Sequence, residues 1–370
     1  MTGNMTPRVS FIVPVYNPGD YLRQALDSVK NQTYENIEII CINDGSTDKS
    51  LEVLREYETA DPRFRVIDKQ NEGYGASCNR GLNEAKGEWI AILEPDDFID
   101  ADMVEKMLAF GDSFSERIDI IKTPYWRIRM PEISGQKRLN CSYKNLVKHT
   151  HQPFSIAEAT DYMSHHPSIW SALYRHDYLN EKDIRFPEIP GAGWADNPFM
   201  IEALLQTDKI VYLDEPFYNY REDSAEKAYA FTRRTPLIPF ERWNDMMDII
   251  ERLNVTDRRI LQAHNQRGFL YMAGVIEVVG LDRADVREAT EHMFMRMDKE
   301  LVLSDPKVSP GYKKLFCSML GIKCPHLNYP NYWFRLASKS FYNMRNTGLT
   351  QALYSIGIFL STHSKRVGKG

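Results

Sequence analysis

Acidic and aromatic side chains stand directly after apolar stretches in the first hundred residues of this 370-residue chain. Tyr16 follows the first stretch, Asp44 follows the second, and Glu94, Asp96 and Asp97 follow the last. Carboxylates gathered in one place repel one another unless a cation or a polar ligand neutralises them. Mg²⁺ and Mn²⁺ accept oxygen ligands from one or two carboxylates together with phosphate groups. The pattern therefore predicts a site for Mn²⁺ or Mg²⁺ bound together with a diphosphate.

The elements that would position these side chains alternate between strands and helices. Apolar, β-branched runs predict strands at 9–16, 37–42, 64–67 and 89–93, and helical periodicity fills the intervals between them. Such alternation is typical of an α/β fold with a mostly parallel sheet and helices on both of its faces. Ligands of these sheets bind beyond the carboxyl ends of the strands, where we expect the polar side chains to meet.

Four short motifs occur in order within this region. They are Val13–Asn17, Asn43–Asp48, Asn71–Gly73 followed by Asn79–Gly81, and Glu94–Asp97. Together they resemble a family 2 glycosyltransferase of the GT-A fold, which is Rossmann-like. The resemblance implies an inverting enzyme of bacterial surface-polysaccharide synthesis. Such an enzyme moves a sugar from a nucleotide-diphosphate donor, here a UDP-sugar, to a hydroxyl group of a glycan or lipid-linked acceptor.

The resemblance assigns a first group of residues to the nucleotide sugar, namely Pro14, Tyr16, Asp44, Asn79 and Arg80. Tyr16 would stack on uracil and Asp44 would contact the base or the ribose. The alternatives are an aromatic residue that merely ends a strand and an aspartate that merely forms a turn. Cys78 departs from the family pattern, because many members carry an arginine there that reaches the base. The identity of the base is therefore open.

The acidic motif corresponds to the metal-binding Asp-x-Asp element of the family, with its first aspartate lengthened to Glu94. The resemblance assigns Asp96 to the cation, Asp97 to the same metal site in a supporting place, and Glu94 to the ribose of the donor or a water of the metal shell. A surface acidic turn is the alternative. The position of the motif directly after the apolar run 89–93 favours the functional interpretation.

A second acidic position lies farther along the chain, after a glycine-rich loop. The segment Trp194–Phe199 is similar to the Glu-Asp-x-x-Phe element of the family, whose aspartate is the catalytic base, although Ala195 replaces the glutamate. Asp196 is therefore the expected base, and a helix N-cap is the alternative. The resemblance also makes Arg221 a candidate ligand of the diphosphate, with ion pairing to its acidic neighbours 222 and 223 as the alternative.

Three aromatic residues in the less specific part of the resemblance are candidates for the acceptor site, namely His166, Trp170 and Trp194. His165 and His166 are adjacent, so they would not share a helical face, and no Glu-x-x-His pattern accompanies them. A metal site made by these histidines is therefore disfavoured relative to a structural or acceptor-binding role.

The resemblance covers an expected catalytic domain at 1–225, and helical periodicity predicts a small helical domain at 226–305, with helices near 240–253, 258–279 and 282–303.

Residues 306–370 carry ten basic and no acidic side chains, so this tail has a charge of +10 against −15 for the rest of the chain. Apolar positions between 349 and 360 predict an amphipathic helix. It could bind an anionic membrane surface or pack on the acidic body, whereas no nucleic-acid-binding motif accompanies the charge.

Composition narrows the protein class further. The 43% of apolar residues and the 26% of charged residues indicate a globular protein with a substantial core. The five cysteines have no paired spacing, and we find no secretory signal and no membrane-spanning run, so we expect a cytoplasmic protein that could be peripheral on the cytosolic face of a membrane.

No Gly-x-Gly-x-x-Gly follows the first strand, which disfavours a dinucleotide-dependent dehydrogenase. Because of the departures at Cys78, Glu94 and Ala195, a catalytically silent nucleotide-sugar-binding scaffold is the alternative function.

Overall fold

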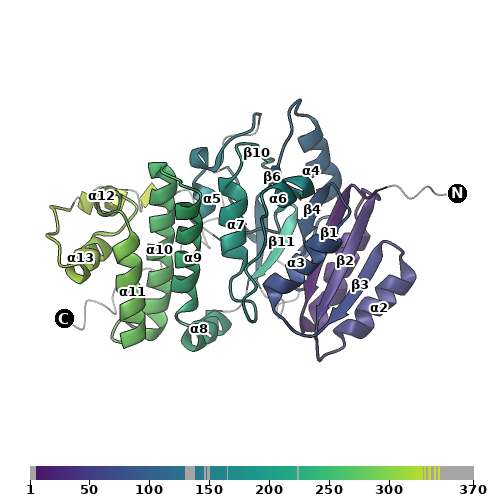
Figure 1. Cartoon of the computed structure of the whole chain (residues 1–370), viewed down its shortest axis with the longest axis horizontal. Helices are drawn as coiled ribbons and strands as arrows, with labels where there is room; N and C mark the ends of the chain where they lie inside the picture. The colour runs from purple at the N-terminus through teal and green to yellow at the C-terminus, as the bar shows by residue number, and fades with distance from the viewer. Residues whose placement is uncertain are drawn as a thin grey trace.

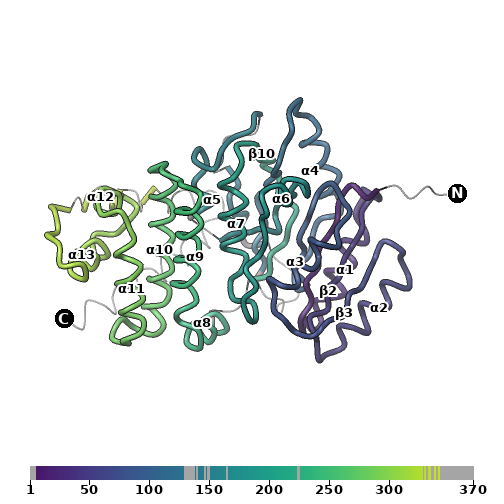
Figure 2. The backbone as a smooth tube through the Cα atoms, in the orientation of Figure 1, coloured from purple at the N-terminus to yellow at the C-terminus, as the bar shows by residue number. Residues whose placement is uncertain are grey.

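The computed structural model describes residues 6–129, 138–145, 147, 151–164, 166–222 and 225–327, and a few positions between 329 and 341. The amphipathic helix predicted at 349–360 and the basic residues after it lie outside the described residues. Figures 1 and 2 show the chain as an elongated molecule with the sheet toward the N-terminal end and a group of helices toward the other.

A seven-stranded, mostly parallel sheet forms the centre of the first half of the chain. The four predicted strands are confirmed as β1 (Val9–Val15), β2 (Ile37–Asp44), β3 (Phe64–Lys69) and β4 (Trp89–Ile92). Three shorter strands complete the sheet, β6 (Ile120–Lys122), β9 (Ala172–Arg175) and β10 (Ile210–Tyr212). The order is β10-β6-β9-β4-β1-β2-β3, in which only β9 runs antiparallel to its neighbours. The predicted α/β class is therefore confirmed.

Helices pack against this sheet with their apolar sides. In α1 (Leu22–Lys30) the buried residues are Leu22, Ala25, Leu26 and Val29, which recur at helical spacing. The other helices and helical turns of this half are η1 (Gly19–Tyr21), α2 (Ser50–Ala60), α3 (Tyr74–Glu84), α4 (Met103–Asp112), η2 (Ile156–Glu158), α5 (Asp161–Ser164), α6 (His176–Glu181) and α7 (Asp196–Leu205).

A second, four-stranded sheet lies at the carboxyl edge of the first. It contains β5 (Phe98–Ile99), β7 (Tyr125–Arg129), β8 (Arg138–Ser142) and β11 (Tyr218–Glu222) in the order β5-β11-β7-β8. Because β11 pairs with β5, residues near 220 lie beside the acidic motif that precedes β5. The sequence pattern did not indicate this sheet.

Up to residue 327, the helices that the structure describes after the sheets are α8 (Ala225–Arg234), α9 (Ile238–Arg252), α10 (Arg258–Val279), α11 (Ala284–Arg296), α12 (Lys299–Ser304) and α13 (Pro310–Met319). Helices α9, α10 and α11 run side by side (Figure 1). The prediction of a single helix over 282–303 is wrong. The helix ends at Arg296, and Asp298 begins the next one by accepting a hydrogen bond from the backbone N–H of Leu301.

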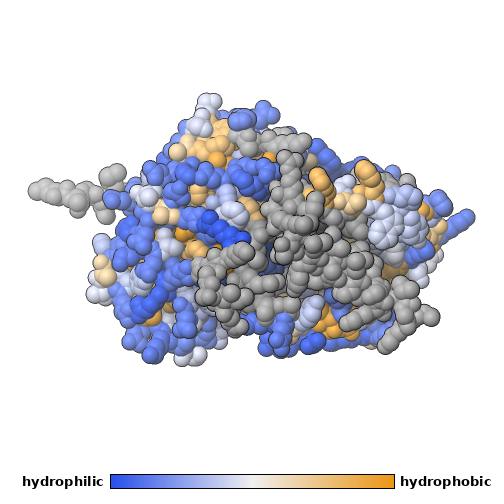
Figure 3. Space-filling model, turned by 180° about the vertical axis from the view of Figure 1, so that it is seen from behind, coloured by the Kyte–Doolittle hydropathy of each residue, from blue (hydrophilic) through white to orange (hydrophobic). Residues whose placement is uncertain are grey.

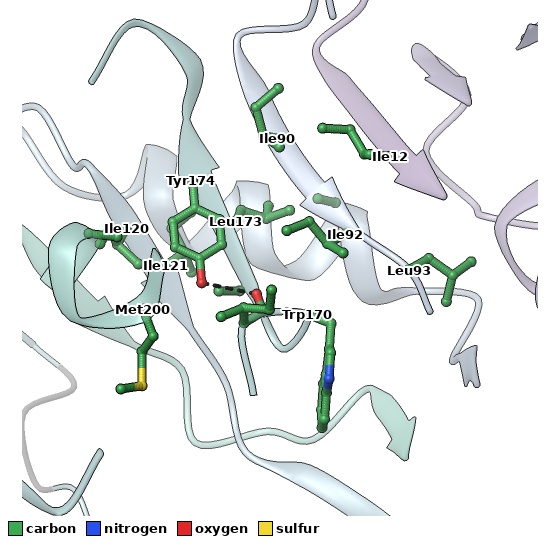
Figure 4. Packing of buried hydrophobic residues seen from close by; sticks show 14 of the residues in the cluster. Ile12, Ile90, Ile92, Leu93, Ile120, Ile121, Trp170, Leu173, Tyr174 and Met200 are labelled. Atoms are coloured by element: carbon green, nitrogen blue, oxygen red, sulfur yellow. Dashed lines mark hydrogen bonds between the residues drawn. The ribbon is translucent and has the colours of Figure 1, made fainter. Parts of the chain in front are cut away.

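Two hydrophobic clusters hold these parts together. The larger cluster surrounds the seven-stranded sheet and also contains Met246 and Ile250 of α9. Figure 4 shows part of it, where the hydroxyl of Tyr174 donates a hydrogen bond to the carbonyl oxygen of Ile169. The smaller cluster joins α9, α10 and α11 to Phe316 of α13. The first residues of the predicted tail therefore pack on the helices, and the domain boundaries at 225 and 305 remain predictions.

The surface seen in Figure 3 is largely hydrophilic over the described residues, with apolar side chains in small separate groups. Among the helices that the structure describes, none combines the length and the apolar character needed to cross a membrane.

Candidate active site

The first element of the site is the carboxyl end of β1. Pro14 is buried within the strand, and Tyr16 directly after it is 54% exposed. A large aromatic ring exposed at the carboxyl edge of a sheet offers a face on which a planar base can stack. The structure therefore keeps Tyr16 available for the role that the resemblance implies.

Asp44 lies at the carboxyl end of the neighbouring strand β2 and is 3% exposed. Its carboxylate accepts hydrogen bonds from the backbone N–H groups of Glu72 and Gly73, both at 2.9 Å, and pairs with Lys69. These contacts tie the end of β2 to the start of α3. The Asn71–Gly73 motif thus forms a loop around the carboxylate of Asp44.

Asn79 and Arg80 occupy different sides of α3. Asn79 is buried and binds the segment after α6, accepting from the N–H of Phe186 at 2.9 Å and donating to Glu188 at 3.0 Å. Arg80 is exposed and pairs with Glu84 one turn along the helix. Residues two apart on a helix point about 160° away from each other, so Arg80 faces away from Cys78 and the site. The structure therefore does not bring Arg80 together with the other predicted nucleotide-binding residues.

Glu94 follows β4 and faces α3. Its Oε1 accepts a hydrogen bond from the hydroxyl of Tyr74 at 2.5 Å. Burial, together with the charges of Asp96 and Asp196, raises the pKa of Glu94 to about 8, with the Tyr74 hydrogen bond acting in the opposite direction. Cys78, one turn after Tyr74, is fully buried, and burial raises its pKa well above the usual value. Cys78 thus fills space behind Glu94.

Asp97 is buried beneath the same loop, and β11 occupies both of its oxygens. Oδ1 accepts from the backbone N–H of Arg221 at 2.7 Å and Oδ2 from the hydroxyl of Tyr218 at 3.0 Å. Burial, with the charge of Asp96 second, raises the pKa of Asp97 well above its usual value. Asp97 therefore holds the loop in place, whereas Asp96 is exposed at the surface of that loop.

Arg221 is 5% exposed, and its guanidinium lies under the acidic motif. It donates to the backbone carbonyl of Asp96 and to Gln24, and it stands over the rings of Tyr21 and Phe98 at 4.7 and 5.0 Å from their centroids. Glu222, one of the two acidic neighbours, forms an ion pair with Arg127. Arg221 thus supports the loop that carries Asp96.

Asp196 is the first residue of α7. Burial raises the pKa of Asp196 to about 6. The positive charge of Arg267 and the hydrogen bonds from the backbone N–H of Asp196 and from Asn197 lower the pKa, but they do not cancel the effect of burial. Nδ2 of Asn197 donates to Oδ1 of Asp196 at 3.1 Å. Asp196 influences the pKa of Tyr74 and of Glu94, so the two acidic segments, 100 residues apart, share one site.

The three aromatic residues predicted for the acceptor site lie in two separate places. Trp170 is 2% exposed and lies between the rings of Tyr218 and Tyr220, and His166 packs beside it. Burial lowers the pKa of His166 to about 3, which keeps the ring neutral. Trp194 lies two residues before Asp196, packs on Tyr271 and Phe231, and has the positive φ of 55°. Of the three, Trp194 is nearest to Asp196 along the chain.

The oxygen ligands around the acidic motif suit a cation that also binds a diphosphate. Within the described part of the chain, no group of three or more His, Cys, Asp or Glu side chains is arranged to hold a metal ion by itself. Asp96 is exposed and carries a carboxylate, which is a hard oxygen ligand, and both oxygens of the buried Asp97 accept hydrogen bonds from β11. Mg²⁺ is often held by one or two carboxylates, with phosphate and water as its other ligands, and Asp96 suits this arrangement.

Sequence reasoning missed Tyr74, Tyr218 and Tyr271. Each donates a hydrogen bond to a side chain of the site, Glu94, Asp97 or Asn197. Tyr74 could have been found, because it directly follows the Asn71–Gly73 motif and lies one turn before Cys78. The other two carry no such signal, because the contacts join segments that are far apart in the chain.

Comparisons with known proteins show the family and the fold of this chain. Residues 10–179 match the family model described as glycosyl transferase family 2. The chain is 33% identical over 222 residues to the putative glycosyltransferase EpsH of Bacillus subtilis, covering 58% of this chain and 61% of EpsH. It is 30% identical over 230 residues to the glycosyltransferase GlyG of Streptococcus pneumoniae, covering 60% of this chain and 72% of GlyG. The crystal structure of S. aureus TarS 1–349 shares the fold, with a TM-score of 0.66 and 19% identity over 85% of this chain and 86% of that one.

Proposed function

Because this chain belongs to glycosyl transferase family 2, we propose that it transfers a sugar from a nucleotide-diphosphate donor to a hydroxyl group, with Asp196 as the general base. One observation carries the proposal. A half-buried carboxyl group at the start of α7, with its pKa raised to about 6 by desolvation, interacts electrostatically with Glu94 of the acidic motif.

The chemistry of the base follows from its environment. An acceptor hydroxyl is a weak nucleophile at neutral pH, and a nearby carboxylate can remove its proton as the new bond forms. A carboxyl group with a pKa near 6 is mostly ionised at pH 7 yet is a stronger base than an exposed aspartate. A single base supports one displacement at the anomeric carbon, which inverts its configuration.

The donor would lie across the ends of β1, β2 and β4. Tyr16 offers a stacking surface for the base, and we propose uracil as that base on the strength of the family resemblance. Asp96 would contribute an oxygen ligand to Mn²⁺ or Mg²⁺, which stabilises negative charge on a leaving diphosphate when it is bound. Arg221 holds the backbone of Asp96 in place from below.

The first experiment measures release of nucleotide diphosphate and transfer of sugar for the wild type and Asp196→Asn. The donor screen starts with UDP-GlcNAc, which is bound in one of the TarS structures, and includes assays with and without Mn²⁺. We expect Asp196→Asn to lower turnover by at least about a hundredfold, the scale of a lost general base, while donor binding persists. Near-full activity of this variant would refute the base assignment.

The same assay addresses the scaffold alternative. A catalytically silent scaffold would be stabilised by the donor against heat yet would release no nucleotide diphosphate with any acceptor. We expect release that depends on Mn²⁺ or Mg²⁺, and loss of this dependence in Asp96→Ala. Asp100→Ala is a suitable control, because Asp100 lies beyond the motif and pairs with Arg138.

We further propose that the acceptor is a glycan or lipid-linked saccharide and that the basic C-terminal segment brings the protein to an anionic membrane. Truncation after residue 305 would remove Phe316 from the smaller hydrophobic cluster, so truncation after residue 327 is the cleaner test. We expect the truncated protein to sediment less with vesicles containing anionic lipid than the full chain. Equal sedimentation of the two proteins would refute the membrane proposal.

A further inference from the structure

Helix α10 is connected to the site through a chain of hydrogen-bonded side chains. Nε of Arg267 donates to the hydroxyl oxygen of Tyr271 at 2.8 Å, and the hydroxyl of Tyr271 donates to Oδ1 of Asn197 at 2.6 Å. Nδ2 of Asn197 then donates to Oδ1 of Asp196 at 3.1 Å. Three hydrogen bonds therefore connect a guanidinium on α10 to the carboxyl group at the start of α7.

The direction of every bond in this chain is determined by chemistry. A guanidinium can only donate, so the oxygen of Tyr271 accepts from Arg267 and its hydrogen is committed to Asn197. The amide oxygen of Asn197 accepts that hydrogen, so the amide nitrogen must face Asp196. A donor directed at a carboxylate stabilises its ionised form, and linked hydrogen bonds polarise one another.

Two members of this chain are shielded from water. Arg267 is 1% exposed and Asn197 is 3% exposed, whereas Tyr271 and Asp196 are half-buried. The ring of Tyr271 also packs against Trp194, at 5.3 Å between centroids. The hydroxyl of Tyr271 can thus be removed while the ring contact is kept.

We infer that Arg267, Tyr271 and Asn197 are positioning residues that orient the carboxylate of Asp196 and favour its ionised form. This inference rests on the proposed function, in which Asp196 is the base. It makes α10 part of the catalytic machinery, although α10 lies in the helical region rather than in the family-defined segment 10–179. The charge of Arg267 acts in the same direction, because it lowers the pKa of Asp196 against the effect of burial.

Other groups face Asp196 and must be considered in any titration. Asp196 interacts electrostatically with titratable groups on α3, at the end of β4, on β9 and on α10, namely Tyr74, Cys78, Glu94, Tyr174, Arg267 and Tyr271. Because Glu94 also titrates, the ionisation of Asp196 has to be identified by comparison with Asp196→Asn.

The test compares Tyr271→Phe with Tyr178→Phe. Tyr178→Phe is a matched control, since the hydroxyl of Tyr178 is buried and donates to the carbonyl of Ala203 on the same helix α7 at 2.7 Å. In Tyr271→Phe we expect the acidic limb of the kcat/KM profile to move up by about half to one pH unit, which lowers kcat/KM about twofold to fivefold at pH 6. The KM for the donor should not change. A profile like that of the wild type, or an equal shift in Tyr178→Phe, would overturn the inference.

A second measurement needs no catalytic activity. The pKa of Asp196 can be followed by NMR titration of the protein with ¹³C-carboxyl-labelled aspartate, with Asp196→Asn supplying the assignment. We expect the pKa to be higher in Tyr271→Phe than in the wild type and in Tyr178→Phe, and equal values would overturn the inference. If the pKa rises but no donor supports transfer, the proposed function fails while the role of α10 in the ionisation of Asp196 stands.

Discussion

The hydroxyl of Tyr218 donates a hydrogen bond to Oδ2 of Asp97 at 3.0 Å, and both side chains are at least 99% buried. The same hydroxyl accepts from the backbone N–H of Glu94 at 3.1 Å. One tyrosine of β11 thus holds both ends of the acidic motif. The shape of the loop that presents Asp96 depends on a strand more than 100 residues away in the sequence.

Tyr218→Phe should therefore destabilise the fold. It leaves one oxygen of a buried carboxyl group without its partner, which costs about 1–3 kcal/mol of unfolding free energy. Urea denaturation measures this change. Tyr220→Phe is the matched control, because Tyr220 packs on the other side of Trp170 and its hydroxyl has no hydrogen bond recorded within the described residues. Equal stabilities of the two variants would contradict the role assigned to Tyr218.

Tyr16→Ala should weaken donor binding without affecting stability. Loss of a base–aromatic contact costs about 1–3 kcal/mol, which corresponds to roughly a 5- to 150-fold increase in Kd. Tyr16→Phe should retain most of the affinity, because the stacking face remains. Isothermal titration with UDP measures the effect. Tyr229→Ala removes another exposed tyrosine, on α8, and should leave Kd unchanged.

Gly75→Ala should disturb the packing of α3. A Cβ atom on Gly75 would lie 2.1 Å from the carbonyl oxygen of Pro187, so α3 or the segment after α6 must move. We expect a loss of about 1–3 kcal/mol in unfolding free energy and lower transferase activity, because Tyr74 is the neighbouring residue. Gly274→Ala is the control within α10, since nothing lies within 4 Å of its Cβ position. It should be neutral or stabilising by about 0.5–1 kcal/mol.

His264→Phe should make stability less dependent on pH. Burial, with the charge of Arg267 second, lowers the pKa of His264 from 6.5 to about 3, so between these values the unfolded chain binds a proton that the native protein does not. The free energy of unfolding therefore falls as pH falls through this window, by up to about 1.4 kcal/mol per pH unit. Phenylalanine can keep the stacking of His264 on Trp243. Urea denaturation at pH 7 and pH 5 measures the slope, and the exposed His151→Phe should not change it.

Much of the fold could be predicted because its signals are local. Strands β1 to β4 are β-branched runs bounded by turn residues, and helical periodicity predicts the helix at 258–279, which has the observed bounds of α10. The break at Met297 was missed because the apolar periodicity continues across it. Only the backbone geometry and the hydrogen bond from the N–H of Leu301 to Asp298 reveal two helices.

Local patterns along the chain were enough to reveal the family resemblance, the parallel sheet, and the candidates Asp96 and Asp196, because strand periodicity and motif order are properties of neighbouring residues. Tertiary structure decided the partners of these residues. It buries Asp97 under Tyr218, turns Arg80 away on α3, places Arg221 under the backbone of Asp96, and connects Arg267 to Asp196 through Tyr271 and Asn197. The contacts of Tyr218 with Asp97, of Arg221 with Asp96 and of Tyr271 with Asn197 join residues 74 to 125 positions apart, and they form because buried polar groups must find partners wherever the packed elements bring them.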